Sequence, residues 1–238
     1  MTARCPSDLQ KPRRKHIRRL GDATFWTIVC PIWWKTAVKM PKRLEVSPYG
    51  LSLCHPDGYD FTNYSFGIND LAAMCEVVLH YKMKTMLEIG SGLSTLLMSQ
   101  ILHVDSLENH AQFAEKVESR RMDRMDFTLI SWDGVNWPTC LADRYDCVFI
   151  DGPELGVTQA EREWYTKKGV FSREPSFVNA PDLTDHIFVH DASWYLEAIA
   201  QITHIAPWFN LVRILKSDND PDIRRHMTYW VRSKPRGT

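Results

Sequence analysis

The sequence lacks an excess of charge of either sign, since 29 Lys and Arg residues balance 29 Asp and Glu residues. Proteins that attract nucleic acid or anionic membranes through their overall field carry a clear positive excess. The balance therefore argues against nucleic acid as a partner, and we expect none. With 238 residues, the chain is long enough for one globular domain with a core of its own.

A disulfide framework and a metal-binding cysteine pair are also missing. The six cysteines are scattered along the chain without a C-x-x-C pair, at Cys5, Cys30, Cys54, Cys75, Cys140 and Cys147. Such usage favours reduced thiols, and we expect a cytoplasmic location.

No apolar run reaches the roughly 18 residues that a membrane-spanning helix needs. The nearest run, Ala23–Trp34, contains Pro31 and follows a basic stretch at residues 11–19. Two interpretations stay open for residues 11–40. They form either an apolar flap packed on the domain or a peripheral contact with a membrane or a partner protein.

The chain divides into an extension and a domain. Residues 1–67 have no clear periodicity and many prolines, glycines and aromatic residues, so we interpret them as a basic and aromatic-rich N-terminal extension. Residues 68–238 form the predicted domain. Asn69 and Asp70 can cap a helix that continues to Tyr81 with helical apolar spacing.

Strand-like and helix-like segments alternate from Lys84 onward. The pattern predicts an α/β fold, a Rossmann-like seven-stranded, mostly parallel sheet with helices on both faces, whose last two strands return as a hairpin. The expected strands are 85–89, 103–107, 127–131, 146–150, 186–189, 211–215 and 227–231, and the expected helices include 94–101 and 111–120. We interpret residues 153–185 as a functional insertion, helical at 158–168, because connections are usually shorter.

The strongest motif is an apolar strand that runs into a glycine turn and then a helix, at Met86–Thr95. Gly90 and Gly92 let the backbone turn sharply and approach a ligand, and free amides at the helix start favour a negatively charged group. The pattern alone is common. Glu88, at the end of the strand, is either a ligand contact for a cationic group or a partner for the loop amides.

Acidic residues follow the next two predicted strands as well. Glu108 stands where a carboxylate accepts hydrogen bonds from the ribose hydroxyls of a nucleoside, although a surface glutamate that opens a helix would look the same. Trp132 and Asp133 suit the face and the amino group of an adenine. An ordinary turn aspartate before Gly134 explains Asp133 equally well.

Three further polar residues follow two apolar strands. Asp151 ends Cys147–Ile150, and His190 with Asp191 ends Ile187–Val189, so all three should meet at the carboxyl edge of the sheet, where open α/β sheets bind ligands. Two interpretations stay open: a site for proton transfer or for a metal with oxygen ligands, and a polar cluster that only shapes the loops.

Taken together, residues 71–231 resemble the class I S-adenosylmethionine-dependent methyltransferases. The E-x-G-x-G pattern of that family is matched by Glu88, Gly90 and Gly92, with Ser94 where many members carry a third glycine, and Glu108 matches the ribose carboxylate. The resemblance implies S-adenosylmethionine as cofactor. It also implies direct displacement, in which an acceptor atom attacks the methyl carbon of the sulfonium in line.

The segments Ile150–Pro153 and Val189–Asp191 are similar to the small-molecule and sugar O-methyltransferase branch, including macrocin-type and cephalosporin-hydroxylase-like relatives. That branch implies O-methylation of a small-molecule or sugar-like acceptor. Some relatives bind a divalent metal such as Mg²⁺ through two carboxylates, and the resemblance implies that Asp151 and Asp191 would be these ligands. It also implies that His190 would remove a proton from the acceptor. The catechol-type pattern has Asn after the second aspartate, whereas this chain has Ala192.

Two rival functions remain at this point. An NAD-dependent oxidoreductase also uses a glycine loop, but the third position of G-x-G-x-x-G is Thr95 rather than Gly or Ala, which argues against close packing on a pyrophosphate. A non-catalytic binding or scaffold module would keep the fold and use the basic, tryptophan-rich N-terminus for docking.

Overall fold

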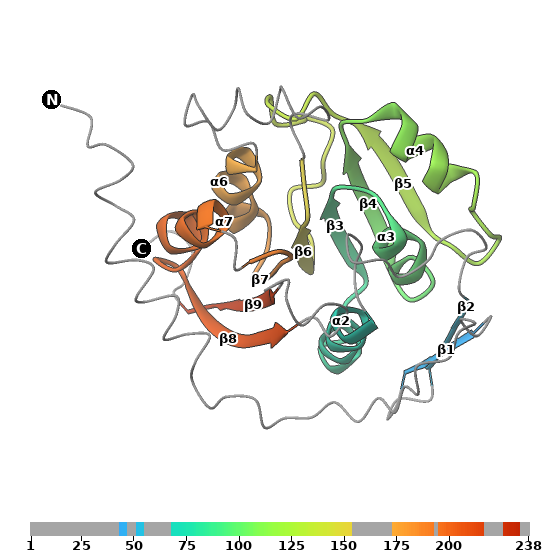
Figure 1. Cartoon of the computed structure of the whole chain (residues 1–238), viewed down its shortest axis with the longest axis horizontal. Coiled ribbons are helices and arrows are strands. Elements are labelled where there is room, and N and C mark those ends of the chain that lie inside the picture. Colours follow the sequence, from blue (N-terminus) through green and yellow to red (C-terminus); the bar gives the residue numbers. More distant parts are fainter. Residues whose placement is uncertain are drawn as a thin grey trace, which may run out of the picture.

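In the computed structural model, the described residues are 43–46, 51–54, 68–153, 173–192, 195–216 and 226–233 (Figure 1). They form a seven-stranded sheet with the order β5-β4-β3-β6-β7-β9-β8. Its strands are β3 (Thr85–Ile89), β4 (His103–Glu108), β5 (Phe127–Ser131), β6 (Cys147–Ile150), β7 (His186–Val189), β8 (Phe209–Lys216) and β9 (His226–Arg232). The first five are parallel, and β9 pairs antiparallel with both β7 and β8. The predicted fold class and the returning hairpin are therefore confirmed.

The central strands are apolar on both faces because both faces are covered. Successive side chains of a strand point to opposite sides, so Met86 and Leu87 of β3 belong to two different cores. In β6, likewise, Phe149 belongs to the first core and Val148 to the second. Strands buried on both sides explain the nearly continuous apolar runs in the sequence.

Helices cover the two faces separately (Figure 1). The first core receives side chains from α2 (Ile68–His80), α3 (Leu93–Met98) and α4 (Ala111–Glu118). The second receives them from α6 (Glu174–Leu183), α7 (Tyr195–Ala200) and the π-helix η1 (Gln201–Ile205). This arrangement leaves the carboxyl ends of β3, β4, β6 and β7 together at one edge of the sheet.

The N-terminal extension contains structure that the sequence pattern does not predict. β1 (Arg43–Val46) and β2 (Leu51–Cys54) pair as an antiparallel hairpin, and Leu53 is buried in the same core as α2. Strands this short carry too little periodicity to be recognised from sequence.

The start of α2 also differs from the prediction. The helix begins at Ile68, so Asp70 lies in its first turn and is not a cap. The Asp70 side chain is buried, with Oδ2 3.7 Å from Nε2 of His190. The capping prediction is wrong because this carboxylate serves a distant histidine instead of its own helix.

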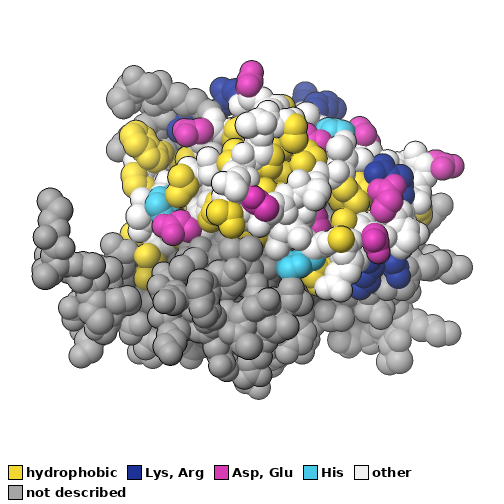
Figure 2. Space-filling view, turned by 90° about the horizontal axis from the view of Figure 1, so that it is seen from above, with side chains coloured by type: hydrophobic (Ala, Val, Ile, Leu, Met, Phe, Trp, Pro, Cys, Tyr) yellow, Lys and Arg dark blue, Asp and Glu magenta, His cyan; other side chains and the backbone are white. Residues whose placement is uncertain are grey.

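The predicted insertion holds α6, which begins at Glu174, while its predicted helix at 158–168 lies outside the described residues, as do residues 11–40. None of the helices in the described parts of the chain is long and apolar enough to cross a bilayer. On the face shown in Figure 2, acidic and basic side chains of the described residues are mixed with apolar ones, and neither sign forms a continuous patch.

Candidate functional site

The glycine turn after β3 is shaped by backbone contact with the end of β6. Gly90 has φ +96°, and a Cβ atom there would lie 3.2 Å from the Asp151 carbonyl and the Gly152 nitrogen. A side chain at Gly90 would therefore push two neighbouring strand ends apart. Gly92 differs, because a Cβ atom there would meet nothing within 4 Å. The loop is closed against the protein at Gly90 and open at Gly92.

The amides of this loop are used within the protein. Gly90 N–H donates to the Leu107 carbonyl at 2.8 Å, and Ser91 N–H donates to Oε2 of Glu108 at 2.9 Å. Gly92 N–H donates to Oγ1 of Thr95, also at 2.9 Å. These three loop amides are therefore already used within the protein. The expectation of free amides concerned the start of the helix, where α3 begins at Leu93, and it stays a prediction.

Glu88 is buried beneath the loop and accepts hydrogen bonds from three hydroxyl groups. Ser94 and Thr95 of α3 donate to its two oxygens, and Ser106 of β4 donates to Oε2 at 2.9 Å. Burial raises the pKa of Glu88 to about 7, although the three hydroxyl hydrogen bonds oppose that rise. Its partners among the described residues are hydroxyls and not loop amides, and contact with a ligand stays a prediction. Ser94 accordingly supports the loop through Glu88.

Glu108 joins the end of β4 to the same loop. Its Oε2 accepts from the hydroxyl of Ser91 at 2.7 Å, in addition to the Ser91 amide, and its Oε1 accepts from the His110 amide at 2.8 Å. A cavity of about 240 Å³ lies beside it. The carboxylate is thus held at the carboxyl edge of the sheet, next to the open side of the glycine loop.

Trp132 and Asp133 form a turn after β5. The buried Trp132 indole donates to the Asn136 carbonyl at 2.6 Å and packs edge-on against Trp137. Asp133 accepts from the Val135 amide at 2.8 Å and from the Asn136 amide and side chain, each at 2.7 Å, and these bonds lower its pKa. Asp133 therefore stabilises the turn, which is one of the two interpretations of the sequence. Its contact with an adenine stays a prediction.

Asp151, His190 and Asp191 come together at the ends of β6 and β7, as their positions predict. Nδ1 of His190 lies 2.9 Å from Oδ1 of Asp151 and 3.8 Å from Oδ2 of Asp191. His190 is buried, whereas 25% of the Asp151 side chain is exposed. Asp191 has φ +52°, a left-handed conformation that occurs often at functional sites. Asp151 is therefore the most exposed of the three side chains.

Carboxylates surround the His190 ring. Burial disfavours its charged form, but the charge and hydrogen bond of Asp151, the hydrogen bond of Asp70 and the charge of Asp191 together raise the pKa of His190 well above its ordinary value. The His190 ring therefore lies between carboxylates and is hydrogen-bonded to Asp151 at 2.9 Å. Proton removal by His190 stays a prediction.

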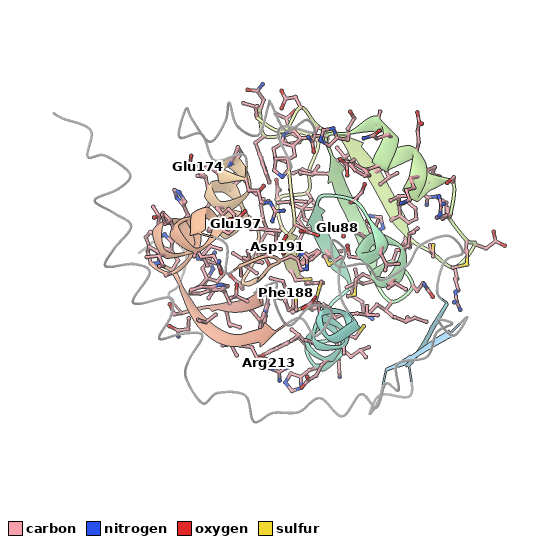
Figure 3. The ribbon with its side chains drawn as sticks, in the orientation of Figure 1. Glu88, Glu174, Phe188, Asp191, Glu197 and Arg213 are labelled. Carbon is pink, nitrogen blue, oxygen red and sulfur yellow. The ribbon has the colours of Figure 1, made fainter. Side chains whose placement is uncertain are left out.

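Three residues of this cluster have no sequence signal that we recognised. Besides Asp70, they are Arg173 and Glu197. Nη2 of Arg173 lies 3.7 Å from Asp151 and 3.9 Å from Asp191, and its Nε lies 3.9 Å from Glu197. Burial raises the pKa of Glu197, against the attraction of Arg173. In Figure 3, Asp191 at the end of β7 lies beside Glu197 of α7.

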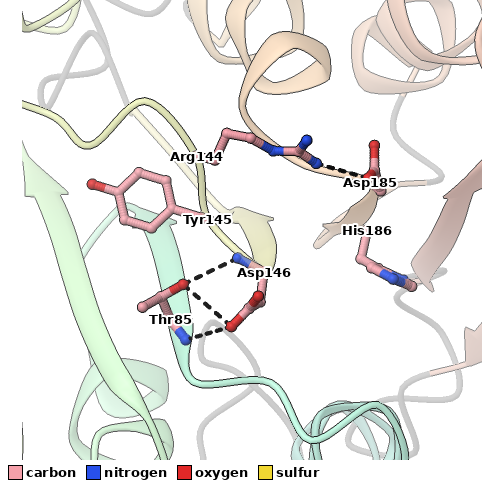
Figure 4. A pocket seen from close by; sticks show the side chains of 6 residues that line it. All are labelled: Thr85, Arg144, Tyr145, Asp146, Asp185 and His186. Atoms are coloured by element: carbon pink, nitrogen blue, oxygen red, sulfur yellow. Dashed lines mark hydrogen bonds and ion pairs between the residues drawn. The ribbon is translucent and has the colours of Figure 1, made fainter. Parts of the chain in front are cut away.

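A second cavity lies at the opposite edge of the sheet, at the amino ends of β3, β6 and β7 (Figure 4). Its volume is about 280 Å³. Its polar side chains bond to one another: Arg144 pairs with Asp185 at 2.7 Å, and Asp146 accepts from the Thr85 amide at 3.0 Å. This cavity is separate from the strand ends that hold the glycine loop and the charged cluster.

No family model matches the chain, and no curated protein matches its sequence. Solved structures do resemble it. A methyltransferase of Podospora anserina with bound S-adenosylhomocysteine is 16% identical, with a TM-score of 0.46 over 72% of this chain and 81% of that one. The magnesium protoporphyrin IX methyltransferase of Synechocystis with bound S-adenosylmethionine is 12% identical, with a TM-score of 0.48 over 68% and 78%.

The N-methyltransferase NodS of Bradyrhizobium japonicum is also 12% identical, with a TM-score of 0.46 over 70% of this chain and 99% of that one. The order of the seven strands, with five of them parallel, is itself Rossmann-like. In a Rossmann-like sheet, ligands bind beyond the carboxyl ends of the strands, which here carry Glu88, Glu108, Asp151 and Asp191.

Proposed function

We propose that the chain is an S-adenosylmethionine-dependent methyltransferase that methylates a hydroxyl oxygen of a small-molecule acceptor. The observation that carries the proposal is the pairing of two features at one strand edge. Glu108 is held against the glycine loop, and Gly92 leaves open space beside it. A carboxylate at that position suits ribose hydroxyls, and the missing side chain lets a nucleoside approach the backbone.

The residues present fit the cofactor. Glu108 would accept hydrogen bonds from the ribose hydroxyls, Gly92 would give the close approach, and Glu88 would keep the loop in shape from beneath. When bound, S-adenosylmethionine supplies a methyl group on a positively charged sulfur.

The same geometry argues against a dinucleotide. A pyrophosphate needs backbone amides at the glycine turn, but the Gly90, Ser91 and Gly92 amides all donate within the protein. Thr95 stands at the third glycine position, and its hydroxyl donates to Glu88 while it accepts from Gly92. A nucleoside without phosphate groups meets neither obstacle.

Asp151 is the residue we assign to the acceptor. It would take the proton of the acceptor hydroxyl while the oxygen attacks the methyl carbon. The oxygen–carbon bond forms as the carbon–sulfur bond breaks, and the sulfur keeps the electron pair and becomes a neutral thioether. His190 would hold Asp151 in place, because its buried ring lies 2.9 Å from Asp151, and Asp191 lies 3.8 Å from the same ring nitrogen.

The first experiment is calorimetric titration of the full chain with S-adenosylmethionine and S-adenosylhomocysteine, with NAD as the comparison. We expect both adenosyl ligands to bind and NAD not to bind. Glu108→Ala should weaken binding roughly tenfold or more, because charge-assisted hydrogen bonds to ribose are lost. Glu115→Ala is the matched control, since Glu115 is an exposed carboxylate beside the same cavity.

Binding must be followed by turnover. We would incubate the protein with S-adenosylmethionine carrying a labelled methyl group and with panels of phenolic, sugar and aliphatic hydroxyl acceptors. Labelled product from one class supports the proposal. Absence of binding to either adenosyl ligand would overturn it, and binding without transfer to any acceptor would favour a scaffold module.

A further inference from the structure

The charged cluster at the ends of β6 and β7 bears on the metal that the sequence resemblance implies. Asp151, His190 and Asp191 each offer one ligand atom, and these atoms lie within 4.8 Å of one another. By distance alone the three residues could approach a metal ion. Whether a metal fits also depends on the groups that already lie beside the carboxylate oxygens.

Arg173 faces the same oxygens that a metal would bridge. Its Nη2 lies 3.7 Å from Oδ1 of Asp151 and 3.9 Å from Oδ2 of Asp191. Nδ1 of His190 also lies 2.9 Å from that Asp151 oxygen. Mg²⁺ needs oxygen ligands at about 2.1 Å in nearly octahedral geometry, and a guanidinium between two of them repels a second cation. The arrangement does not fit a divalent metal.

The Arg173 guanidinium nonetheless has a nitrogen atom that makes no hydrogen bond to the described residues. Only 8% of Arg173 is exposed, and Nη1 is buried without a hydrogen-bond partner within the described parts of the chain. Its shortest distance to a carboxylate, 3.7 Å, is longer than a direct hydrogen bond. A buried donor without a partner costs about 1–3 kcal/mol, so such donors persist mainly where a ligand or a function uses them.

We propose that Arg173 takes the place of a divalent metal at the acceptor site and donates a hydrogen bond through Nη1 to the oxygen that becomes methylated. This inference rests on the proposed methyl transfer. As the hydroxyl proton moves to Asp151, negative charge develops on the acceptor oxygen, and the guanidinium stabilises it until the oxygen–carbon bond has formed. Because a single donor contacts a single oxygen, a lone hydroxyl group is a sufficient acceptor and a chelating diol is not needed.

The metal half of the inference is tested on the wild-type protein without an acceptor. After dialysis against EDTA, we would add Mn²⁺ and follow free and bound ion by electron paramagnetic resonance, with and without S-adenosylmethionine. We expect no stoichiometric binding at micromolar Mn²⁺. Binding that Asp151→Asn abolishes would overturn the inference, as would turnover that EDTA removes and Mg²⁺ restores.

The arginine half is tested with Arg173→Ala and Arg173→Lys. We expect Arg173→Ala to lower kcat roughly 100-fold, as loss of one charge-stabilising donor does elsewhere, while the Kd for S-adenosylmethionine changes less than about threefold. Arg173→Lys should recover part of the rate, because it keeps the cation. Arg144→Ala is the control, since Arg144 lies at the opposite edge of the sheet.

The outcomes separate this inference from the proposed function. If S-adenosylmethionine binds and turnover is measurable, an unchanged kcat in Arg173→Ala overturns the role of Arg173 alone. If the wild-type protein fails to bind S-adenosylmethionine, the methyltransferase proposal fails first, and the Mn²⁺ experiment still decides whether the cluster is a metal site. Circular dichroism and thermal unfolding of each variant show whether a rate loss reflects unfolding; Arg173→Lys then carries the test.

Discussion

The two halves of the carboxyl edge hold their carboxylates in different ways. At β3 and β4, the Glu88 and Glu108 side chains accept hydrogen bonds from hydroxyls and amides of the adjoining loop and helix, including those of Ser91 and Ser106 at 2.7–2.9 Å. At β6 and β7, Asp151 and Asp191 face the Arg173 cation at 3.7 and 3.9 Å. The first is the closely bonded half. The second keeps a 2.9 Å hydrogen bond between His190 and Asp151, but we call it the loosely paired half after its long distances to Arg173.

The contrast suggests that one half binds the cofactor and the other half acts on the acceptor. Closely bonded carboxylates fix the shape of a loop before a ligand arrives, which suits a cofactor of constant structure. The Arg173 guanidinium can shift toward an acceptor while Asp151 keeps its hydrogen bond to His190, because the distances from Arg173 to the two aspartates exceed a hydrogen bond. The proposed chemistry uses both halves, because the methyl donor must be held still while the acceptor oxygen loses its proton.

The largest effect is expected at the loosely paired half. Asp151→Asn keeps the size of the side chain but removes the group that takes the proton, so kcat should fall at least roughly 100-fold. The Kd for S-adenosylmethionine should stay within about threefold of wild type, as measured by calorimetry. A kcat close to that of the wild-type protein would remove Asp151 from the mechanism.

A pH-dependent effect is expected at the closely bonded half. The pKa of Glu88 is raised from 4.5 to about 7, so the folded protein binds this proton more tightly than the unfolded chain does. Its contribution to stability is therefore full below about pH 4.5 and is lost as the pH rises through about 7. Glu88→Gln carries no titrating group at this position.

The free energy of unfolding of the wild-type protein, relative to that of Glu88→Gln, should consequently fall by on the order of 3 kcal/mol between about pH 4 and pH 8. Urea unfolding of both proteins across this range measures the difference. Glu115→Gln, an exposed substitution on α4, is the control. A difference that does not change with pH would show that Glu88 does not titrate in this window.

Two alanine substitutions separate the folding role of the glycine loop from its binding role. Gly90→Ala meets the Asp151 backbone at a positive φ and should destabilise the protein by about 2 kcal/mol. Gly92→Ala meets nothing and should change stability by less than about 0.5 kcal/mol, yet weaken S-adenosylmethionine binding roughly tenfold. Unaltered affinity in Gly92→Ala would mean that no ligand approaches there.

The smallest effect is expected at the turn after β5. Asp133 uses its oxygens on Val135 and Asn136, so Asp133→Ala should change the Kd for S-adenosylmethionine less than about threefold. Calorimetric titration of Asp133→Ala and of the wild-type protein measures this difference in Kd. A much larger loss of affinity would make Asp133 an adenine contact, as the sequence also allows.

Sequence patterns alone predicted most of the sheet. All seven strands were predicted within two residues of their observed bounds. The signal is strongest for β3, β6 and β7, because strands buried on both faces are apolar almost throughout. The hairpin of β1 and β2 was missed, since each strand has only four residues. α7 and η1 were also missed, since a short helix resembles a loop in sequence.

Local chain order explains how the glycine turn and Glu108 meet in the closely bonded half of the site. The Gly90 and Gly92 turn lies between a strand and a helix, and Glu108 follows the next strand, so local order brings them together. In the other half, the order of the strands brings Asp151, His190 and Asp191 together, but their further partners depend on how the helices pack. Asp70, Arg173 and Glu197 come from three separate elements and meet at His190 and its neighbours because the helices pack against opposite faces of one sheet. No local spacing encodes a contact between side chains so far apart in the chain.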